Sequence, residues 1–270
     1  MPLKVVPRLA TMQRPPFLVQ AVLGWLVGLP PVTRVIVCLS VTLTIACSLE
    51  IIHPLRLYYH PRLCWAHGQW WRVLTTFLFF GEVRDLRDAL HLLLNVVFVL
   101  RYARSLESAS FAGRPADFLW MLLLGGAGML AAVSAGLVPG THLFLSHSLG
   151  HMVLYVWARR HPQALLNLMG VLTFAAPWLP WVLTGFHCLL GGRPWGHLLG
   201  IAAGHLYWYL DEVAPLVLPR PHRRLLRAPW PLRAALGQAP PGARPPPHFR
   251  VLPGALRFGG GLGGGDERER

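Results

Sequence analysis

The sequence predicts an all-α polytopic membrane protein with six transmembrane helices and a disordered tail. Of its 270 residues, 54% are hydrophobic and only 13% are charged, whereas roughly a quarter are charged in soluble domains. The mean hydropathy of +0.45 comes from apolar runs spread over most of the chain. The formal net charge of +14 fits basic residues that set membrane topology, so no nucleic-acid partner is expected.

Six apolar segments are candidates for spanning helices, which need about 20 mostly apolar residues. The second, fourth and sixth carry polar side chains, which are costly in lipid and are therefore expected to face the bundle interior. In order, the expected spans are Val35–Ile52, Ala89–Ala103, Phe118–Val138, His142–Ala158, a proline-kinked helix within Leu165–Leu190, and Trp195–Leu210.

The segments outside the spans complete the domain organisation. Residues 1–31 are expected to be a cytosolic or interfacial segment, with a transit peptide as the alternative because the stretch lacks acidic residues. Residues 32–213 form the membrane domain, and its aromatic-rich loop at 53–88 is expected to lie partly in the interface. Residues 214–270, rich in Pro, Gly and Arg, are predicted to be a disordered tail.

Lysine and arginine counts predict the orientation. With six spans, the segments on the side of both termini hold 19 of these residues and the opposite segments hold six. Positive charge favours the cytosolic side. Both termini are therefore expected in the cytosol.

Neither cysteines nor histidines predict a metal or cofactor. The four cysteines have no paired C-x-x-C spacing, which argues against a zinc ribbon, a thioredoxin-like site and a disulfide scaffold. His147 and His151 are four residues apart, but no third ligand accompanies them. We therefore expect no metal and no cofactor.

Several strings together resemble the Derlin family of rhomboid-like proteins of the endoplasmic reticulum. They occur in the family's order between about residues 18 and 213. The strings are GQWWRVLTTFLFFG (68–81), NVVFVLRYARSLE (95–107), SFAGRPADF (110–118), YVWARR (155–160), GVLTFAAPWLPWVLTGF (170–186) and LLGIAAGHLYWYLDEV (198–213).

The resemblance implies a six-helix rhomboid-like bundle that is a pseudoprotease, not an enzyme, in the endoplasmic reticulum membrane. It implies a role in endoplasmic-reticulum-associated degradation and the unfolded protein response. Misfolded luminal and membrane proteins would pass to the cytosol through a lateral opening and a locally thinned bilayer. The implied partners are these clients, a ubiquitin-ligase complex, a cytosolic AAA ATPase of the valosin-containing type, and further copies or relatives in an oligomer. A plastid or other organelle membrane is the alternative location.

Residues carry over from the family at matching positions. The Trp-Arg pair of the first loop is Trp71–Arg72, which could anchor the loop at the headgroup level and disturb lipid packing. The G-x-x-x-G of the sixth helix is Gly200 and Gly204, which allow close helix packing. Asn95 and His205 also match family positions and are expected to pack between helices.

The end of the tail departs from the family pattern. RFGGGLGGG (257–265) only loosely resembles the aromatic-Gly-x-Gly-x-x-Leu box by which some Derlins hold the ATPase, because Leu262 follows Gly261 directly. Direct ATPase binding would use Phe258 and Leu262. The alternative is a low-complexity end with no binding role.

A second resemblance, to active rhomboid proteases, gives an alternative function. Ser146 falls where their nucleophile would lie, His197 matches their H-x-x-G-x-x-x-G base, and His91 and Asn95 match their oxyanion-stabilising H-x-x-x-N. However, Phe144 and His147 replace the glycines that flank the nucleophile. A Ser146→Ala change separates the two functions, since only a protease needs the hydroxyl. A solute transporter has little support, because we find no inverted repeat and no central acid.

Overall fold

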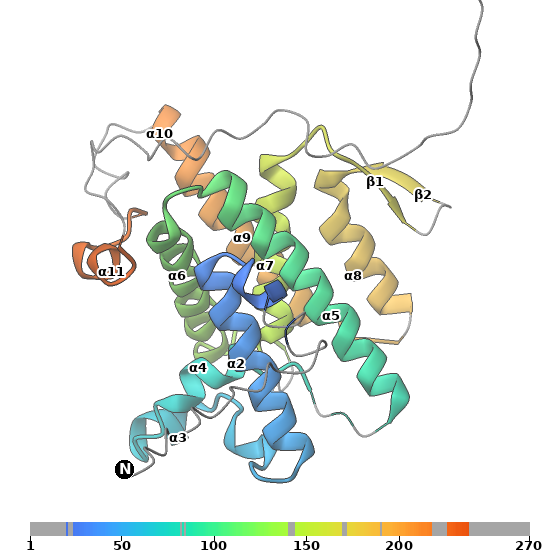
Figure 1. Ribbon diagram of the computed structural model, residues 1–270, viewed down its shortest axis with the longest axis vertical. Helices are drawn as coiled ribbons and strands as arrows, with labels where there is room; N and C mark the ends of the chain where they lie inside the picture. The colour runs from blue at the N-terminus through green and yellow to red at the C-terminus, as the bar shows by residue number, and fades with distance from the viewer. Residues whose placement is uncertain are drawn as a thin grey trace, which may run out of the picture. The chain divides into compact units, whose positions relative to one another are not determined.

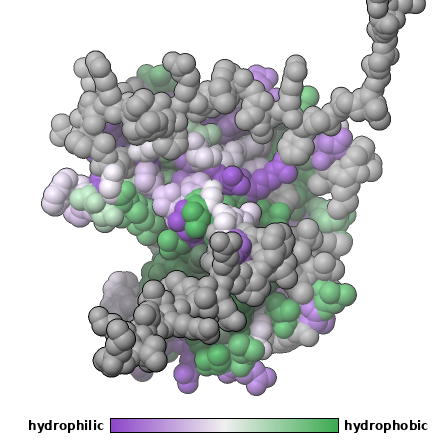
Figure 2. All heavy atoms as spheres, viewed as in Figure 1, coloured by the Kyte–Doolittle hydropathy of each residue, from purple (hydrophilic) through white to green (hydrophobic). Residues whose placement is uncertain are grey.

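The computed structural model describes residues 20, 24–81, 83, 85–139, 144–168, 172–189, 191–217 and 226–237. All of them belong to one compact unit that ends at Gln238. This part of the chain is mostly helical (Figure 1). On the face that Figure 2 shows, hydrophobic atoms occupy much of the middle and lower part, and hydrophilic atoms gather in a band above them.

The first long helix, α2 (Pro31–Ser48), begins at a proline, and a side chain from a distant part of the chain binds its N-terminus. The backbone amides of Val32 and Thr33 each donate to the Glu107 carboxylate over 2.8 Å, and the Thr33 hydroxyl donates over 2.6 Å. A carboxylate at a helix N-terminus satisfies free amides and complements the helix dipole. The helix therefore starts four residues before the expected Val35.

Short helices fill the connection that follows α2. They are η1 (Pro54–Arg56), α3 (Pro61–Ala66) and α4 (Trp71–Leu78). Next come α5 (Leu86–Ser105), its π-helical continuation η2 (Leu106–Ser110) and α6 (Pro115–Ser134). These helices match the expected second and third spans to within three or four residues at each end.

Helix α7 (Ser146–Arg160) lies in the middle of the bundle, with α6 on one side and α8 on the other (Figure 1). Its most extensive contact is with α9 (Trp195–Trp208), and it also packs against α4, α5, α6 and α8. Residues of α7 from Met152 to Ala158 are all buried. The core of the fold therefore surrounds this helix, which matches the expected fourth span.

The expected fifth span was wrong over its first half. Strands β1 (Leu165–Leu168) and β2 (Leu172–Ala175) pair antiparallel, with Asn167 opposite Thr173. A short turn η3 (Ala176–Trp178) leads into α8 (Leu179–Leu189), which has only 11 residues. Proline fixes its own backbone and disfavours helix at the residue before it. Pro177 therefore delays the helix where a kink was expected.

The ordered part of the chain extends beyond the boundary expected at residue 213. After η4 (Tyr209–Val213), residues form α10 (Ala214–Val217) and α11 (Trp230–Ala235). Ala228 is buried and its amide donates to Asp117 over 3.0 Å, while α11 packs against α6. Buried contacts of this kind order a segment whose composition predicted disorder. Residues 238–270, including Phe258 and Leu262, lie outside the described residues.

Two of the described helices, α2 and α6, are long and apolar enough to cross a membrane by themselves. Helix α5 has the length but carries four charged residues. Helices α7, α8 and α9 have 15, 11 and 14 residues. Helix length and charge therefore do not by themselves establish the expected count of six spans.

Candidate functional site

Two glycines let α9 lie directly against α7. A Cβ atom at Gly200 would overlap the backbone carbonyl of Ser148, and one at Gly204 would lie 3.0 Å from the carbonyl oxygen of Met152. Because the obstacle is backbone in both cases, no side-chain rotation would relieve it. We call this contact the α7–α9 seam. It fixes which residues of the two helices face each other.

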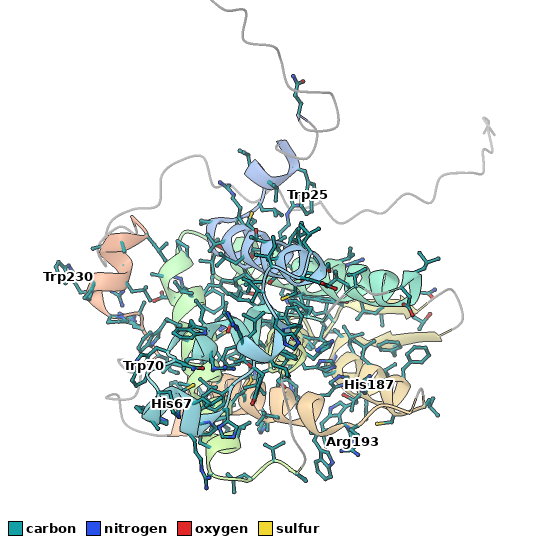
Figure 3. All side chains as sticks on the ribbon, turned by 90° about the horizontal axis from the view of Figure 1, so that it is seen from below. Trp25, His67, Trp70, His187, Arg193 and Trp230 are labelled. Carbon is teal, nitrogen blue, oxygen red and sulfur yellow. The ribbon has the colours of Figure 1, made fainter. Side chains whose placement is uncertain are left out.

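Four histidines from three helices gather at one end of the seam, and we call them the histidine cluster. The ring of His197 on α9 stacks on that of His151 on α7, with centroids 4.0 Å apart. The ring of His187 on α8 is tilted, and its centroid lies 4.2 Å from that of His197. The ring centroid of His147 on α7 lies 6.5 Å from that of His197. Figure 3 marks His187 on the ribbon of α8. His147 and His151, four residues apart on α7, thus both stack with His197. Among the described residues, no three side chains form a group that could hold a metal ion.

Two ring nitrogens of the histidine cluster are buried without a hydrogen-bond partner in the described part of the chain. They are Nε2 of His151 and Nδ1 of His197. Nδ1 of His151 lies 3.0 Å from the carbonyl oxygen of His147, so it carries the proton and donates. In a neutral ring Nε2 is then an acceptor. Such a group costs free energy when it is buried and unpaired, and a ligand can relieve that cost.

The nucleophile and base of the protease alternative, Ser146 and His197, make no hydrogen bond to each other in the described structure. Ser146 is fully buried at the first position of α7, and its hydroxyl lies 3.5 Å from Nδ1 of His147. His197 instead stacks within the histidine cluster, with its Nδ1 unpaired. A nucleophile needs its base within hydrogen-bond reach. This arrangement does not provide it.

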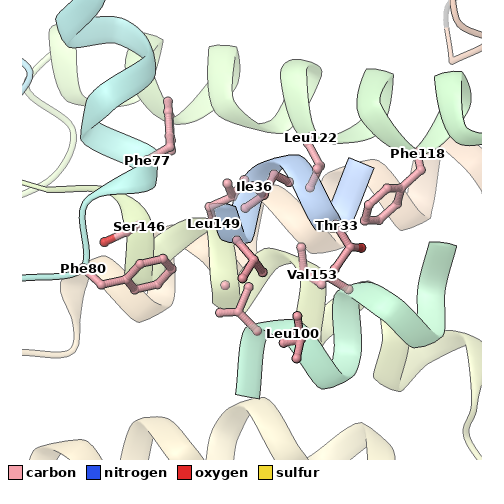
Figure 4. Close-up of a pocket in the computed structure, with 14 residues that line it drawn as sticks. Thr33, Ile36, Phe77, Phe80, Leu100, Phe118, Leu122, Ser146, Leu149 and Val153 are labelled. Atoms are coloured by element: carbon pink, nitrogen blue, oxygen red, sulfur yellow. The ribbon is translucent and has the colours of Figure 1, made fainter. Parts of the chain in front are cut away.

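The surroundings of Ser146 also differ from an open catalytic site. Its side chain lines an apolar cavity with Phe77, Phe80 and Thr33 (Figure 4), and the cavity volume is about 20 Å³. That is room for about one water molecule. Phe144 packs on Phe79 with ring centroids 4.7 Å apart. His91 and Asn95 lie in α5, but their side chains are outside the described residues.

The side chain of Arg72, which was expected from the sequence to anchor the loop at the headgroup level, is turned into the protein. It is only 6% exposed. Its guanidinium donates to the carbonyl oxygens of Leu55 and Tyr58 over 2.8 and 3.0 Å and to the Gln69 side chain over 2.6 Å. Arg72 therefore ties the connection between α2 and α5 together.

Its neighbour Trp71 faces outward. The indole of Trp71 is about half exposed, as are Trp70 and Leu74, and Trp65 is more so. Trp65 and Trp70 pack edge to face, 5.0 Å apart, and Figure 3 shows Trp70 beside His67 at the edge of the bundle. Arg72 thus supports an exposed aromatic surface.

His205 lies at the other end of the seam from the histidine cluster. Its Nδ1 accepts from the Tyr155 hydroxyl over 2.7 Å, and the same hydroxyl accepts from Arg159 over 2.9 Å. Beside it, Arg160 binds both Asp211 and Glu212. These contacts close that end of the seam with polar bonds, beyond the close approach at Gly200 and Gly204.

The sequence reasoning missed two residues that organise this site. Glu107 holds the start of α2, and His187 completes the histidine cluster. Glu107 could have been noticed in the sequence, because it is the one acid of the segment that forms η2, and acids are seldom buried without partners. His187 had no such signal, since its partners lie on other helices.

Helices α5 and α8 barely touch each other in the described structure. Helix α5 packs on α2 and α7, whereas α8 packs on α7, η3 and α9. We call this sparsely packed border between the two helices the α5–α8 opening, after the role that we propose for it below. His187 belongs to α8, so the histidine cluster includes a side chain from one of the bordering helices.

Comparison with known proteins gives a consistent result. The Der1-like family matches residues 29–230. Derlin-2.1 of Zea mays is 38% identical over 247 residues, which cover 89% of this chain and 96% of the relative. Derlin-2.2 of Arabidopsis thaliana is 40% identical over 82% of this chain and 90% of its own length. The probable derlin-2 homolog of Dictyostelium discoideum is 35% identical over 76% and 79%.

Proposed function

This chain belongs to the Der1-like family, and from that premise we propose that it assists degradation of misfolded proteins of the endoplasmic reticulum. In this proposal, luminal and membrane clients move toward the cytosol through the α5–α8 opening. The protein acts as a rhomboid-like pseudoprotease that binds and guides the client without cleaving it.

The histidine cluster is the observation that carries the proposal. It places two unpaired ring nitrogens inside an apolar bundle, beside α8, which makes little contact with α5. A polypeptide that enters the membrane must find partners for its own amides and carbonyls. Nε2 of His151 is an acceptor that a client amide can use. The cluster therefore lowers the cost of holding a client segment at this depth.

Short helices and exposed aromatics support local thinning of the bilayer. At 1.5 Å per residue, α7, α8 and α9 are about 22, 16 and 21 Å long, against about 30 Å for a hydrocarbon core. Helices that are too short draw the bilayer thinner around them. Trp65 on α3, Trp70 just before α4 and Trp71 on α4 would lie at the membrane interface and anchor the thinned region of the bilayer.

The proposed topology has six spans, formed by α2, α5, α6, α7, α8 and α9. Both termini face the cytosol, as the distribution of Lys and Arg indicates. On that side a ubiquitin-ligase complex and the AAA ATPase would receive the client. Direct contact of the ATPase with Phe258 and Leu262 would need a motif that this tail matches only loosely, so the proposal does not depend on it.

Client turnover tests the role of the histidine cluster. In cells that lack their own Derlins, the wild-type chain should restore degradation of a misfolded luminal client. The double variant His151→Leu/His197→Leu should insert normally but prolong the client half-life several-fold. His67→Leu, which changes an exposed histidine between α3 and α4, is the matched control and should behave as wild type. An unchanged half-life in the double variant would overturn the proposal.

Ser146→Ala separates this function from proteolysis. The alternative of an intramembrane serine protease requires loss of client cleavage in this variant. Because the Ser146 hydroxyl has no bond to His197, we expect Ser146→Ala to support client degradation at the wild-type rate. Covalent labelling of Ser146 by a mechanism-based serine-protease inhibitor would contradict the pseudoprotease assignment.

A further inference from the structure

An apolar groove runs between α6 and α9, on a different side of the bundle from the α5–α8 opening. Its volume is about 530 Å³, and we call it the α6–α9 groove. The side chains along it are apolar apart from the Tyr207 hydroxyl and the Trp120 indole N–H. Residues that line it include Trp120, Leu124, Gly128 and Ala132 on α6 and Leu206 and Leu210 on and after α9.

A polar pocket of about 230 Å³ adjoins the groove at the end where α6 begins and α9 ends. Three arginines line it, Arg114, Arg160 and Arg227, together with Asp117 and Asp211. Tyr207, Leu210 and Leu226 line both the pocket and the groove, so the two are continuous. The combined site is polar at one end and apolar along the rest.

The arginines of the pocket are only partly neutralised. Arg160 is engaged by Asp211 and Glu212. Asp117 accepts the amide of Ala228 and lies 3.9 Å from Arg114, whose side chain is more than half exposed. Arg227 is exposed and makes no ion pair within the described part of the chain. Arg227, which no carboxylate engages in the described residues, and Arg114, which meets Asp117 only at 3.9 Å, are thus the guanidiniums that can bind an anion.

We propose that the α6–α9 groove and its arginine pocket bind one anionic phospholipid. The acyl chain lies in the groove, and the phosphate with its headgroup lies against Arg114 and Arg227. From Trp120 to Ala132, α6 advances about 18 Å, which is close to the thickness of one hydrocarbon leaflet. Basic pockets between membrane helices are suited to anionic headgroups. This site is separate from client handling and does not depend on it.

The lipid proposal predicts selectivity for charge. Full-length protein in nanodiscs of dioleoylphosphatidylcholine is titrated with dioleoylphosphatidylinositol, and bound lipid is counted by native mass spectrometry. We expect one tightly bound phosphatidylinositol per protein. Arg114→Gln/Arg227→Gln should weaken its binding on the order of 10- to 30-fold. Arg101→Gln/Arg104→Gln removes the same charge from exposed positions on α5 and should leave binding unchanged.

A second pair of variants tests the groove. A Cβ at Gly128 meets nothing within 4 Å, so Gly128→Phe fills the groove without disturbing the fold. We expect it to weaken phosphatidylinositol binding at least tenfold. Gly185→Phe places the same ring on an equally open position of α8 and should have no effect.

Three results would overturn the proposal. The first is equal binding of phosphatidylcholine and phosphatidylinositol. The second is binding that neither Arg114→Gln/Arg227→Gln nor Gly128→Phe weakens. The third is full competition by soluble inositol phosphate, which would mean that the acyl chain and the groove contribute nothing.

Discussion

The α7–α9 seam and the α5–α8 opening are two helix borders of one bundle with opposite character. In the seam, glycines bring backbone against backbone, and polar bonds close one end. At the opening, the two helices barely meet, and His187 of α8 joins the histidine cluster at the end of the seam, where two ring nitrogens are unpaired. From this difference we propose that the seam holds the fold together and that the α5–α8 opening is where another chain enters. Changes in the seam should therefore lower stability, and changes at the opening should lower function.

The largest expected effect comes from breaking the seam. Gly200→Leu places a side chain where the Ser148 carbonyl already lies, so the helices must separate. We expect a loss of about 3 kcal/mol or more in the free energy of unfolding, measured by denaturant titration in detergent. Gly185→Leu on α8, where a Cβ meets open space, should change it little. Equal losses in the two variants would show that the seam is not special.

The next largest loss of stability is expected from a substitution of Arg72, which ties together the connection between α2 and α5. Arg72→Ala leaves the carbonyls of Leu55 and Tyr58 and the Gln69 amide oxygen without their donor. We expect it to cost about 2 kcal/mol and to raise hydrogen exchange in α3 and α4 but not in the seam. Trp71→Ala removes an exposed neighbour and should keep wild-type stability. If Arg72→Ala changes neither stability nor exchange, Arg72 does not tie the loop together.

A smaller effect is expected at Glu107, which fastens α2 to the turn that follows α5. Glu107→Gln preserves the shape but weakens the bonds to the amides of Val32 and Thr33. We expect a loss of about 1.5 kcal/mol, measured by the same titration. Glu50→Gln, at an exposed acid just past α2, is the control. A full-sized effect in Glu50→Gln would indicate a general charge effect instead.

The smallest change in stability is expected from a substitution in the histidine cluster, and this variant separates an effect on function from an effect on stability. His151→Leu removes a buried acceptor that has no partner, so the free energy of unfolding should stay within about 1 kcal/mol of wild type or rise. Client degradation should nevertheless slow. A stability loss as large as that of Gly200→Leu would show that His151 holds the seam together and would contradict the client-binding role proposed for its unpaired nitrogen.

The sequence predicted the helices whose polar or glycine positions follow a helical period. Helices α2, α5, α6, α7 and α9 lie within a few residues of their expected spans, because apolar length and the G-x-x-x-G spacing are local signals. The hairpin at 165–175 was missed, since an apolar run of this length is ambiguous between helix and strand. The order beyond residue 213 was missed because it depends on Asp117, more than 100 residues away.

The candidate site was only half predictable for the same reason. Gly200, Gly204, Ser146 and His197 were identified from spacing, and the structure places all four along or beside α7. The way His197 stacks on His151, and its lack of a bond to Ser146, depend on how three helices meet. Burial of Arg72 likewise depends on the carbonyls of residues 14 and 17 positions away. Such contacts leave no local pattern.

Photo-crosslinking to a client tests the central claim most directly. A photoreactive side chain is placed at Val97 on α5 or Phe186 on α8, both about half exposed, and at Leu123 on α6 as a similarly exposed control. We expect a misfolded luminal client, arrested during its degradation, to form adducts with positions 97 and 186 but not with position 123. Adducts at position 123 that equal or exceed the others would mean that clients do not enter between α5 and α8.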